Sequence, residues 1–487
     1  MGNSPHSAPI HILDDDSLLH VFYFCRPFLF GEDEDDDARL TGGRASWIHG
    51  RWWFRLVHVC QRWRNVIFGS PSYLALSLVC TYGTPIADML EHSPRLPLVI
   101  DYSDEYRDLT AEDGKGAILA LKQHDRVRGI RLCVPTTTLQ GLIMAMDEEY
   151  PILEYLIIER QYGDCSILEF SKTLQTPHLR LLSLVGFALP IESRLLTTAV
   201  RLITLCLTMT GSSTYPHPNT LLQWLSFMPQ LETLAIGFFD FIAFPGLGIY
   251  RRLTDTPIAT PVTRPVTLPK LHRFKFRGDI PFVEAFVPQI TTPRLDKLVI
   301  IFSKQLTVSV PHLVQFMNTT ESLRFDSAKI VFCDGRVDMK LYSRGGDEIH
   351  ALSLTVESSH PTSQVSSMAQ ISDALSQAFS TVEHLALELE EVYTPSYEGH
   401  SDVDPTEWRR LLRSFSNVKQ VKTLLIAERL VEQVSRCLQL DGGEVTLDLL
   451  PDLQELTYSG SGNAGDAFTS FIDARQNAGH LITLTRY

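Results

Sequence analysis

The chain has 487 residues, 44% of them hydrophobic and 21% charged, which is enough to bury one large core or about two to three ordinary ones. Lys and Arg number 43 against 57 Asp and Glu, so the net charge of −14 argues against a broad electrostatic footprint for nucleic acid or an anionic membrane. A local basic patch stays compatible with this balance.

The N-terminus, the most apolar segment and the cysteines indicate the cellular compartment of the protein. The N-terminus has no basic region followed by an apolar core, so no secretory signal is predicted. The most apolar segment, residues 18–30, is interrupted by Arg26 and Pro27 and is shorter than the roughly 20 residues that cross a bilayer. The eight cysteines are scattered, without a Cys-x-x-Cys pair or a Cys/His cluster at metal-ligand spacing. We therefore expect a cytoplasmic or nuclear protein with reduced, mostly buried cysteines and no metal.

Two amphipathic helices are predicted near the N-terminus. In residues 13–22, Leu18, Leu19 and Phe22 recur at helical spacing behind Asp14, whose carboxylate and those of the next two residues can cap the helix. A second helix is predicted to end at Ser70 and Pro71. Its apolar stripe consists of Leu56, Val59, Cys60, Trp63 and Ile67.

These helices resemble an F-box, the module that docks onto the Skp adaptor of a cullin-type ubiquitin ligase. The segment 13–22 stands where the family carries Leu-Pro-x-Glu-x-Leu-x-x-Ile-Phe, and Val-Cys-Gln-Arg-Trp-Arg at 59–64 matches its Val-Cys-x-x-Trp-Arg. Pro71, Tyr73 and Leu74 stand near its closing Pro-x-Leu-Trp. Two departures are Asp14 in place of the usual proline and an insert at about 26–52, which contains the acidic run 32–37. The resemblance covers residues 1–75.

The resemblance implies an adaptor-binding set, although spacing leaves open which side chains pack inside the module. The set is Leu13, Leu18, Leu19, Phe22, Val59, Cys60, Trp63 and Pro71. The alternative is that the helices only cap the following domain, since apolar stripes usually form a core. The acidic run favours a solvated loop over a site for a basic partner.

Residues 76–487 repeat one order, a helix followed by a phrase apolar-x-x-apolar-x-apolar. The phrases stand at residues 127–132, 153–158, 179–184, 202–207, 231–236, 271–276 and 295–300, and weaker ones at 323–325, 349–354, 382–387 and 453–458. Their spacing of roughly 23 to 40 residues resembles leucine-rich repeats, whose units must stack to share a core. We expect an α/β fold, an irregular solenoid with a parallel sheet. In the phrase 231–236, Leu234 and Ile236 should point inward, with Thr233 and Ala235 outward.

Further elements are predicted around these phrases. A strand, a helix and a strand are expected at 76–80, 86–92 and 96–101, later helices at 220–228, 311–317, 371–379 and 408–415, and another strand at 418–421. Three loops rich in proline or polar residues interrupt the order, at 211–218, 244–269 and 391–405. Tolerated insertion is the favoured interpretation of each loop, and a binding role is the alternative.

The sequence gives no indication of a catalytic site. Gly-Ser-Gly-Asn-Ala-Gly at 460–465, between a strand at 456–458 and a helix at 466–475, fits dinucleotide-binding spacing, but the strand and helix units that such a fold requires do not follow. A glycine-rich turn is therefore favoured. There is no Walker loop or nucleophile elbow, and the 16 histidines are dispersed.

We therefore expect no enzyme and no cofactor. The resemblance to the fungal family of F-box proteins with degenerate leucine-rich repeats implies a substrate receptor of an SCF-type ligase. Its partners would be a Skp-type adaptor, through it a cullin, and an unknown target protein. The alternative is a protein-binding repeat scaffold whose F-box-like segment is only a cap.

Overall fold

The computed structural model describes residues 12–25, 52–104, 107–160, 168–170, 172–189, 193–210, 216–239, 265–303, 309–320, 322–343, 350–358, 360–376, 379, 381–390, 403–416, 421–438, 449–459 and 464–486. It is a mixed α/β structure with mostly parallel strand pairing. The chain divides into two compact units, residues 1–215 with 240–249, and residues 216–239 with 250–487.

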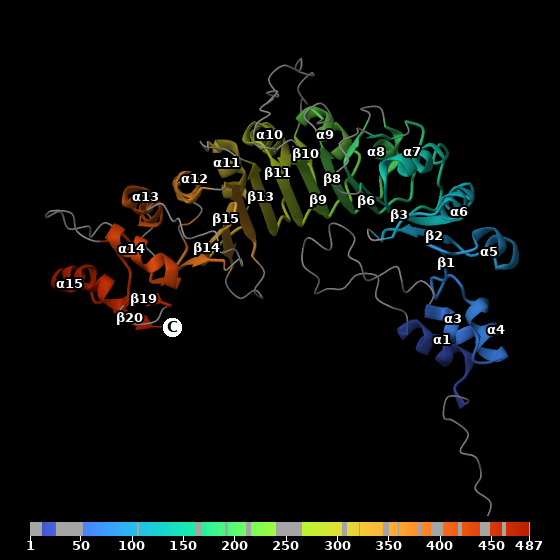
Figure 1. The fold of residues 1–487 in the computed structure, drawn as a ribbon, viewed down its shortest axis with the longest axis horizontal. Helices are drawn as coiled ribbons and strands as arrows, with labels where there is room; N and C mark the ends of the chain where they lie inside the picture. The colour runs from blue at the N-terminus through green and yellow to red at the C-terminus, as the bar shows by residue number, and fades with distance from the viewer. Residues whose placement is uncertain are drawn as a thin grey trace, which may run out of the picture. The chain divides into compact units, whose positions relative to one another are not determined.

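Among its described residues, the first unit begins with the short helices α1 (Asp15–Phe24), α3 (Trp52–Val57) and α4 (Gln61–Gly69) (Figure 1). The predicted first helix is confirmed, and α4 ends before Ser70 as expected. The prediction of one helix through Leu56, Val59 and Cys60 is wrong. The chain leaves helical geometry at 58–60, because Cys60 is extended, with φ −160° and ψ 169°, and caps the next helix.

The sheet of the first unit is parallel between all neighbouring strands. Its strands, in spatial order, are β1 (Leu78–Cys80), β2 (Leu98–Tyr102), β3 (Val127–Val134), β4 (Tyr155–Arg160), β6 (Leu181–Val185) and β8 (Thr204–Thr210). Between them come α5 (Ile86–His92), α6 (Ala111–Leu121), α7 (Thr136–Met144) and α8 (Arg194–Thr198). A small parallel pair joins β5 (Leu168–Glu169) to β7 (Phe187–Ala188). The predicted strand, helix and strand at the start of this unit are confirmed, within two residues at their ends.

The second unit continues the alternation of strands and helices. Its strands, in spatial order, are β9 (Thr233–Phe239), β11 (Arg273–Gly278), β13 (Lys297–Ser303), β16 (Leu352–Glu357), β15 (Arg336–Tyr342), β14 (Ser327–Cys333), β17 (His384–Leu389), β18 (Thr423–Ile426), β19 (Glu455–Tyr458) and β20 (Thr483–Arg486). A separate pair joins β10 (Val266–Thr267) to β12 (Ile290–Thr291).

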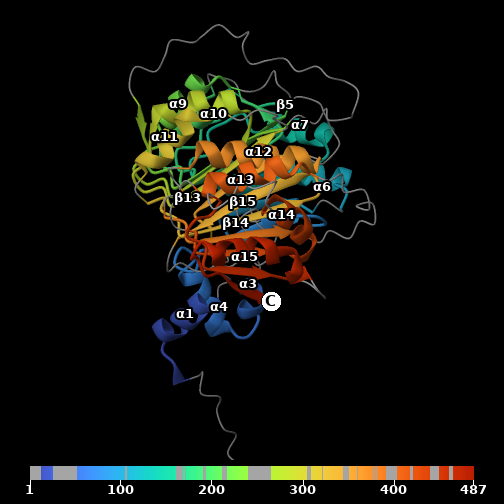
Figure 2. The ribbon, with the colours of Figure 1, turned by 90° about the vertical axis from the view of Figure 1, so that its left-hand side faces the viewer.

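The helices of the second unit follow one another along one side of its sheet (Figure 2). They are α9 (Pro218–Leu225), α10 (Ile280–Phe286), α11 (Pro311–Thr319), α12 (Pro361–Ala374), α13 (Pro405–Ser416), α14 (Val431–Leu438) and α15 (Thr469–Asn477), with 3₁₀ turns η5 (Val287–Gln289), η7 (Glu428–Leu430) and η8 (Ala464–Phe468).

The expectation of parallel strands throughout is wrong at β14, β15 and β16. β14 and β15 form an antiparallel hairpin, in which Cys333 pairs with Arg336 across the turn formed by Asp334 and Gly335. Gly335 has φ 78°, in the left-handed region that glycine adopts without steric cost. β15 then pairs antiparallel with β16, which returns beside β13.

The repeated phrases occupy the same structural position across most of the chain. Their first apolar residue lies two positions before the strand and closes a turn: the Leu153 amide donates to the Tyr150 carbonyl (3.3 Å), and the Leu231 amide donates to that of Met228 (3.2 Å). Leu234 and Ile236 are buried as predicted. Ala235, expected on the exposed face, is also buried, because its small side chain lies beside the longer Lys275 of β11.

Several predicted boundaries are wrong. The helix expected at 371–379 is α12, which starts at Pro361 and ends at Ala374. The chain is not a strand at 323–325, and the strand expected at 418–421 is β18, which starts at Thr423; residues 417–420 lie outside the described residues. The helix expected at 466–475 begins as a 3₁₀ turn.

The loops at 211–218, 244–269 and 391–405 and the glycine-rich turn at 460–465 lie mostly outside the described residues, as does the acidic run at 32–37. Of the described cysteines, Cys25 is exposed, Cys60 is half-buried and the others are buried, and none forms a disulfide. Within the described ranges, no helix has the length and hydrophobicity needed to span a membrane.

Candidate functional site

The N-terminal helices form a small module whose first helix is fixed at its beginning. The Ser17 amide donates to Oδ1 of Asp14 (2.7 Å), so Asp14 caps α1 in the position where the F-box pattern has proline. This bond from the Ser17 backbone, then the Ser17 side chain and the charge of Arg62, lower the pKa of the Asp14 carboxyl below its usual 3.8. The departure from the family pattern is therefore compatible with a stable helix.

Arg62 connects the two helices that carry the predicted residues. From the first turn of α4, its Nε donates to Oδ1 of Asp15 (2.8 Å) and its guanidinium donates to the carbonyl of Leu13 (2.5 Å). The Asp15 carboxylate is largely exposed, so the ion pair itself contributes less than about 1 kcal/mol. Its structural effect is to hold the start of α1 against the start of α4.

The core of the module lies between the same helices. Leu18 and Phe22 of α1 and Ile67 of α4 are buried, and the ring of Phe22 meets that of Trp63 edge-on at a centroid distance of 4.9 Å. Such aromatic pairs contribute about 0.5–1.5 kcal/mol beyond the area that they bury. Leu18, Phe22 and Trp63 therefore stabilise the module, and of the three only Trp63 is partly exposed.

The break between α3 and α4 has its own contacts. The Trp63 amide approaches Sγ of Cys60 at 3.5 Å, so the cysteine takes the capping position, and Nε of Arg64 donates to the carbonyl of Val57 (3.1 Å). Val59, in the turn between the helices, is 58% exposed. The turn thus presents an apolar side chain to solvent.

An aromatic patch lies on the outer side of α1. It consists of His20, Tyr23 and Phe24 of α1 and Tyr73, which follows α4. Tyr73 and His20 share a hydrogen bond between Oη and Nδ1 (3.0 Å), and the rings of Tyr23 and Tyr73 lie 5.3 Å apart. Phe24 is 75% exposed, and Tyr23 and Tyr73 are also exposed. Exposed apolar side chains that lie in contact with one another are typical of an interaction site.

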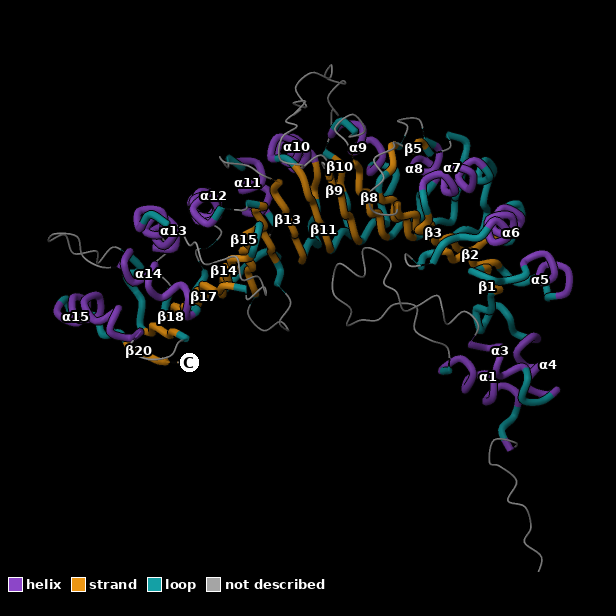
Figure 3. The backbone as a smooth tube through the Cα atoms, in the orientation of Figure 1, coloured by secondary structure: helices purple, strands orange, loops and turns teal. Residues whose placement is uncertain are grey.

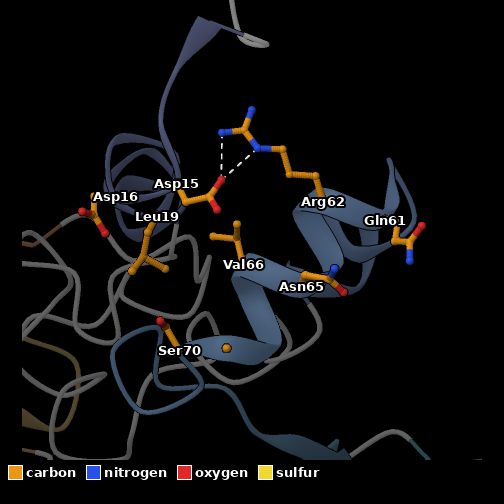
Figure 4. A pocket seen from close by; sticks show the side chains of 9 residues that line it. Asp15, Asp16, Leu19, Gln61, Arg62, Asn65, Val66 and Ser70 are labelled. Carbon is orange, nitrogen blue, oxygen red and sulfur yellow. Dashed lines mark hydrogen bonds and ion pairs between the residues drawn. The ribbon is translucent and has the colours of Figure 1, made fainter.

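A shallow groove of about 480 Å³ runs between α1 and α4 (Figure 4). Leu19 of α1 and Val66 of α4 lie on its two sides, and Asp15 and Arg62 close one end. The remaining lining residues are Asp16, Gln61, Asn65, Gly69 and Ser70. Most of these lining residues are polar, but apolar atoms make up about half of the exposed surface of the groove.

The structure separates the predicted site residues into three groups. Leu18 and Phe22 are buried in the module, and Val59 is exposed. Leu13, Leu19, Cys60, Trp63 and Pro71 are half-buried. The sequence pattern did not predict the aromatic patch, although Tyr73 stands near a family position. Nor did it predict that Arg62, a residue of the Val-Cys-x-x-Trp-Arg motif, joins the two helices.

Comparison with known proteins adds no identification: no protein-family model matches this sequence, and no curated protein matches it. Within the part of the chain that the structure describes, no three His, Cys, Asp or Glu side chains are grouped so that they could hold a metal ion.

Proposed function

We propose that this chain is the substrate-recognition subunit of an SCF-type ubiquitin ligase, which binds a Skp-type adaptor through α1, α3 and α4. The observation that carries this proposal is that the module exposes apolar side chains that its own core does not use, at or next to positions where the sequence resembles an F-box. They are Val21, Tyr23, Phe24, Val59 and Tyr73. Burying such side chains against a partner yields roughly 25 cal/mol per Å² of apolar surface.

We also infer that the strands and helices after the module form a degenerate leucine-rich-repeat-like solenoid. Parallel pairing between most neighbours and the turn that recurs before many of the strands support this inference. In this function the chain breaks no bonds itself. It holds a target protein near the ligase's catalytic subunits, reached through the adaptor and cullin, and so raises the target's effective concentration. The expected site of action is the cytoplasm or nucleus.

A specific set of contacts favours the second candidate function, a repeat scaffold that the helices only cap. Trp53 of α3 is buried, and its Nε1 donates to the carbonyl of Ser77 (3.3 Å) just before β1. Leu74 and Leu76, in the connection to β1, are buried as well. The first strand of a stacked sheet needs such a cover, because repeat arrays end in capping elements.

A capture experiment with purified Skp adaptor distinguishes the two functions. The intact chain is compared with Phe24→Asp/Val59→Asp, which places charge on the exposed surface without entering the core. Met144→Asp, at an exposed apolar residue in α7, is the control for adding a charge. Leu18 is unsuitable, because burying a carboxylate there would unfold the module.

The ligase function predicts that the intact chain and Met144→Asp capture the adaptor at micromolar concentration. The double variant should lose it by about tenfold or more while its circular dichroism stays unchanged. If the intact, folded chain captured no adaptor, the capped scaffold would be the better account.

A further inference from the structure

The last strand of the second unit, β20, has a neighbouring strand on one side only (Figure 3). It pairs in parallel with β19, and no described strand lies on its far side. All four of its residues, 483–486, are exposed. By contrast, β1, at the other end of the strand order, is buried at every position. The far side of β20 is therefore an open sheet edge.

A row of leucines that is buried elsewhere in the sheet reaches this edge and is exposed there. The register places side by side Leu385 of β17, Leu424 of β18, Leu456 of β19 and Leu484 of β20. The first three are at most 2% exposed, whereas Leu484 is 38% exposed. Because register partners share a face of the sheet, Leu484 occupies a core position. A further strand beyond β20 would bury it as its neighbours are buried.

The backbone of β20 presents hydrogen-bonding groups to the open edge. The Thr483 amide donates to the Gln454 carbonyl just before β19 (2.8 Å), so the peptide groups of Thr483 face β19. Peptide groups of successive strand residues point to opposite sides, which directs those of Leu484 and Arg486 to the open edge. An edge with such groups is a template for pairing with another strand.

The sequence at this edge favours pairing with an identical strand. Residues 481–486, Leu-Ile-Thr-Leu-Thr-Arg, combine high β-propensity with a single charge and contain neither proline nor glycine. Segments of this composition on an exposed edge tend to pair with copies of themselves. Leu481, just before β20, is 82% exposed and adds to the apolar surface. Charged side chains commonly protect natural edge strands, and here Arg486 alone is charged.

We propose that β20 pairs antiparallel with β20 of a second copy of this chain, in a two-fold symmetric dimer. A pairing centred on Leu484 places this side chain beside Leu484 of the partner subunit, and the two leucines complete the buried row. Thr483 then faces Thr485 of the partner subunit, and pairs of threonines stabilise sheets. Arg486 faces Ile482 of the partner subunit, so no like charges are opposed.

A second copy fits this edge better than an unrelated peptide does. Any extended peptide could bond to the exposed backbone groups, but the buried row requires an apolar side chain opposite Leu484, and every copy of the chain supplies one. Since β1 is buried, the pairing closes at two copies. About four paired residues bury less than the roughly 1,200 Å² of a stable interface, so we expect a reversible dimer that forms at about 10–100 µM.

Sedimentation velocity of the full-length chain, from about 1 to about 300 µM, tests the proposal. Leu484→Lys places a charge at the centre of the pairing, where two copies would bring two ammonium groups together. Leu119→Lys is the matched control, because Leu119 is 37% exposed and lies in α6, away from any strand edge. Thermal unfolding checks that each variant is folded. None of these residues belongs to α1, α3 or α4, so the inference is independent of the proposed function.

The intact chain and Leu119→Lys should change reversibly from monomer to dimer as their concentration rises. In Leu484→Lys the dimer should be weaker by about tenfold or more, because like charges are opposed. An intact chain that stays monomeric at about 300 µM would overturn the proposal. So would a folded Leu484→Lys variant that dimerises like the intact chain, or an intact chain that grows beyond the dimer.

Hydrogen exchange of the same samples locates the contact. The amides of Leu484 and Arg486 point to the open edge, so their exchange should slow as the dimer forms and stay fast in Leu484→Lys. Exchange of the α1 amides should not depend on concentration. A dimer that leaves the two edge amides unprotected would show that the copies associate through another surface. Protection of these amides in the monomer would show that another segment of the same chain occupies the edge. Either result would contradict the proposed pairing.

Discussion

The ring of Tyr155 lies directly on the backbone of Gly129: the two are register partners on β4 and β3, and a methyl group at position 129 would stand 1.7 Å from Cε2 of the ring. On the same face, Tyr155 belongs to a buried cluster with Val79 and Val99, against which Leu181 packs. The ring cannot move aside without disturbing that cluster, so glycine is required at position 129 for space.

Gly129→Ala should therefore destabilise the first unit by about 1–3 kcal/mol, the usual cost of overpacking a close-packed region. Gly141→Ala is the matched control, because nothing lies within 4 Å of its added methyl group in α7, where alanine favours the helix. Urea unfolding followed by circular dichroism measures both. If Gly129→Ala were as stable as the original chain, the contact with Tyr155 would be wrong.

Leu18 and Val59 belong to the same predicted adaptor-binding set, but their substitution by alanine should change stability by different amounts. Leu18→Ala removes a fully buried side chain and should cost about 2–5 kcal/mol. Val59→Ala changes an exposed side chain and should stay within about 0.5 kcal/mol. Hydrogen exchange of the α1 amides measures the effect within the module. Equal protection of α1 in the two variants would contradict the assignment of Leu18 to the core.

Apolar spacing predicted the presence of the N-terminal helices better than the role of their residues. The stripe continues through Val59 and Cys60, so the pattern could not reveal that the backbone turns there. In α1 the run from Val21 to Phe24 is apolar at every position, and spacing alone does not identify Phe22 as the buried member. Burial depends on the partner helix, which the local sequence does not specify.

After the N-terminal helices, the apolar phrases predicted where most strands lie but placed their starts too early. The spacing predicts that the first leucine of a phrase belongs to the strand. In the structure this leucine is buried in the turn before the strand. Apolar spacing cannot distinguish a buried turn residue from a buried strand residue. The hairpin of β14 and β15 was missed although its Asp-Gly turn is a known hairpin signal. The repeated order of helix and strand predicts parallel strands, and this prediction conflicts with the local hairpin signal.

The hairpin turn gives a further prediction. Gly335→Ala should destabilise the second unit by about 1–2 kcal/mol, because an alanine at φ 78° brings its Cβ close to the backbone, although the space around it is free. Asp334→Ala, the neighbouring exposed position of the same turn, should change stability by about 0.5 kcal/mol or less. Thermal unfolding compares them. Equal losses of stability in the two variants would mean that backbone strain at position 335 does not determine the stability of the turn.

His350 should make the second unit less stable in mild acid. Burial first, and then the charges of Lys297 and Lys340, lower the folded pKa of this histidine from the ordinary 6.5 to about 4, so between these values the unfolded chain binds a proton that the folded chain refuses. Stability is therefore unaffected by this group above pH 6.5 and falls as the pH drops from 6.5 towards 4. Because the imidazole is partly exposed, solvent screening reduces the expected loss between pH 7 and pH 5 to about 1 kcal/mol.

His350→Gln should remove that part of the pH dependence, since glutamine does not titrate beside Lys297 and Lys340. His480→Gln, at an exposed position, makes the same substitution away from these lysines and serves as the control. Urea unfolding at pH 7 and pH 5 gives the two differences in free energy. A loss in His350→Gln as large as that in the original chain would show that groups other than His350 cause the acid sensitivity.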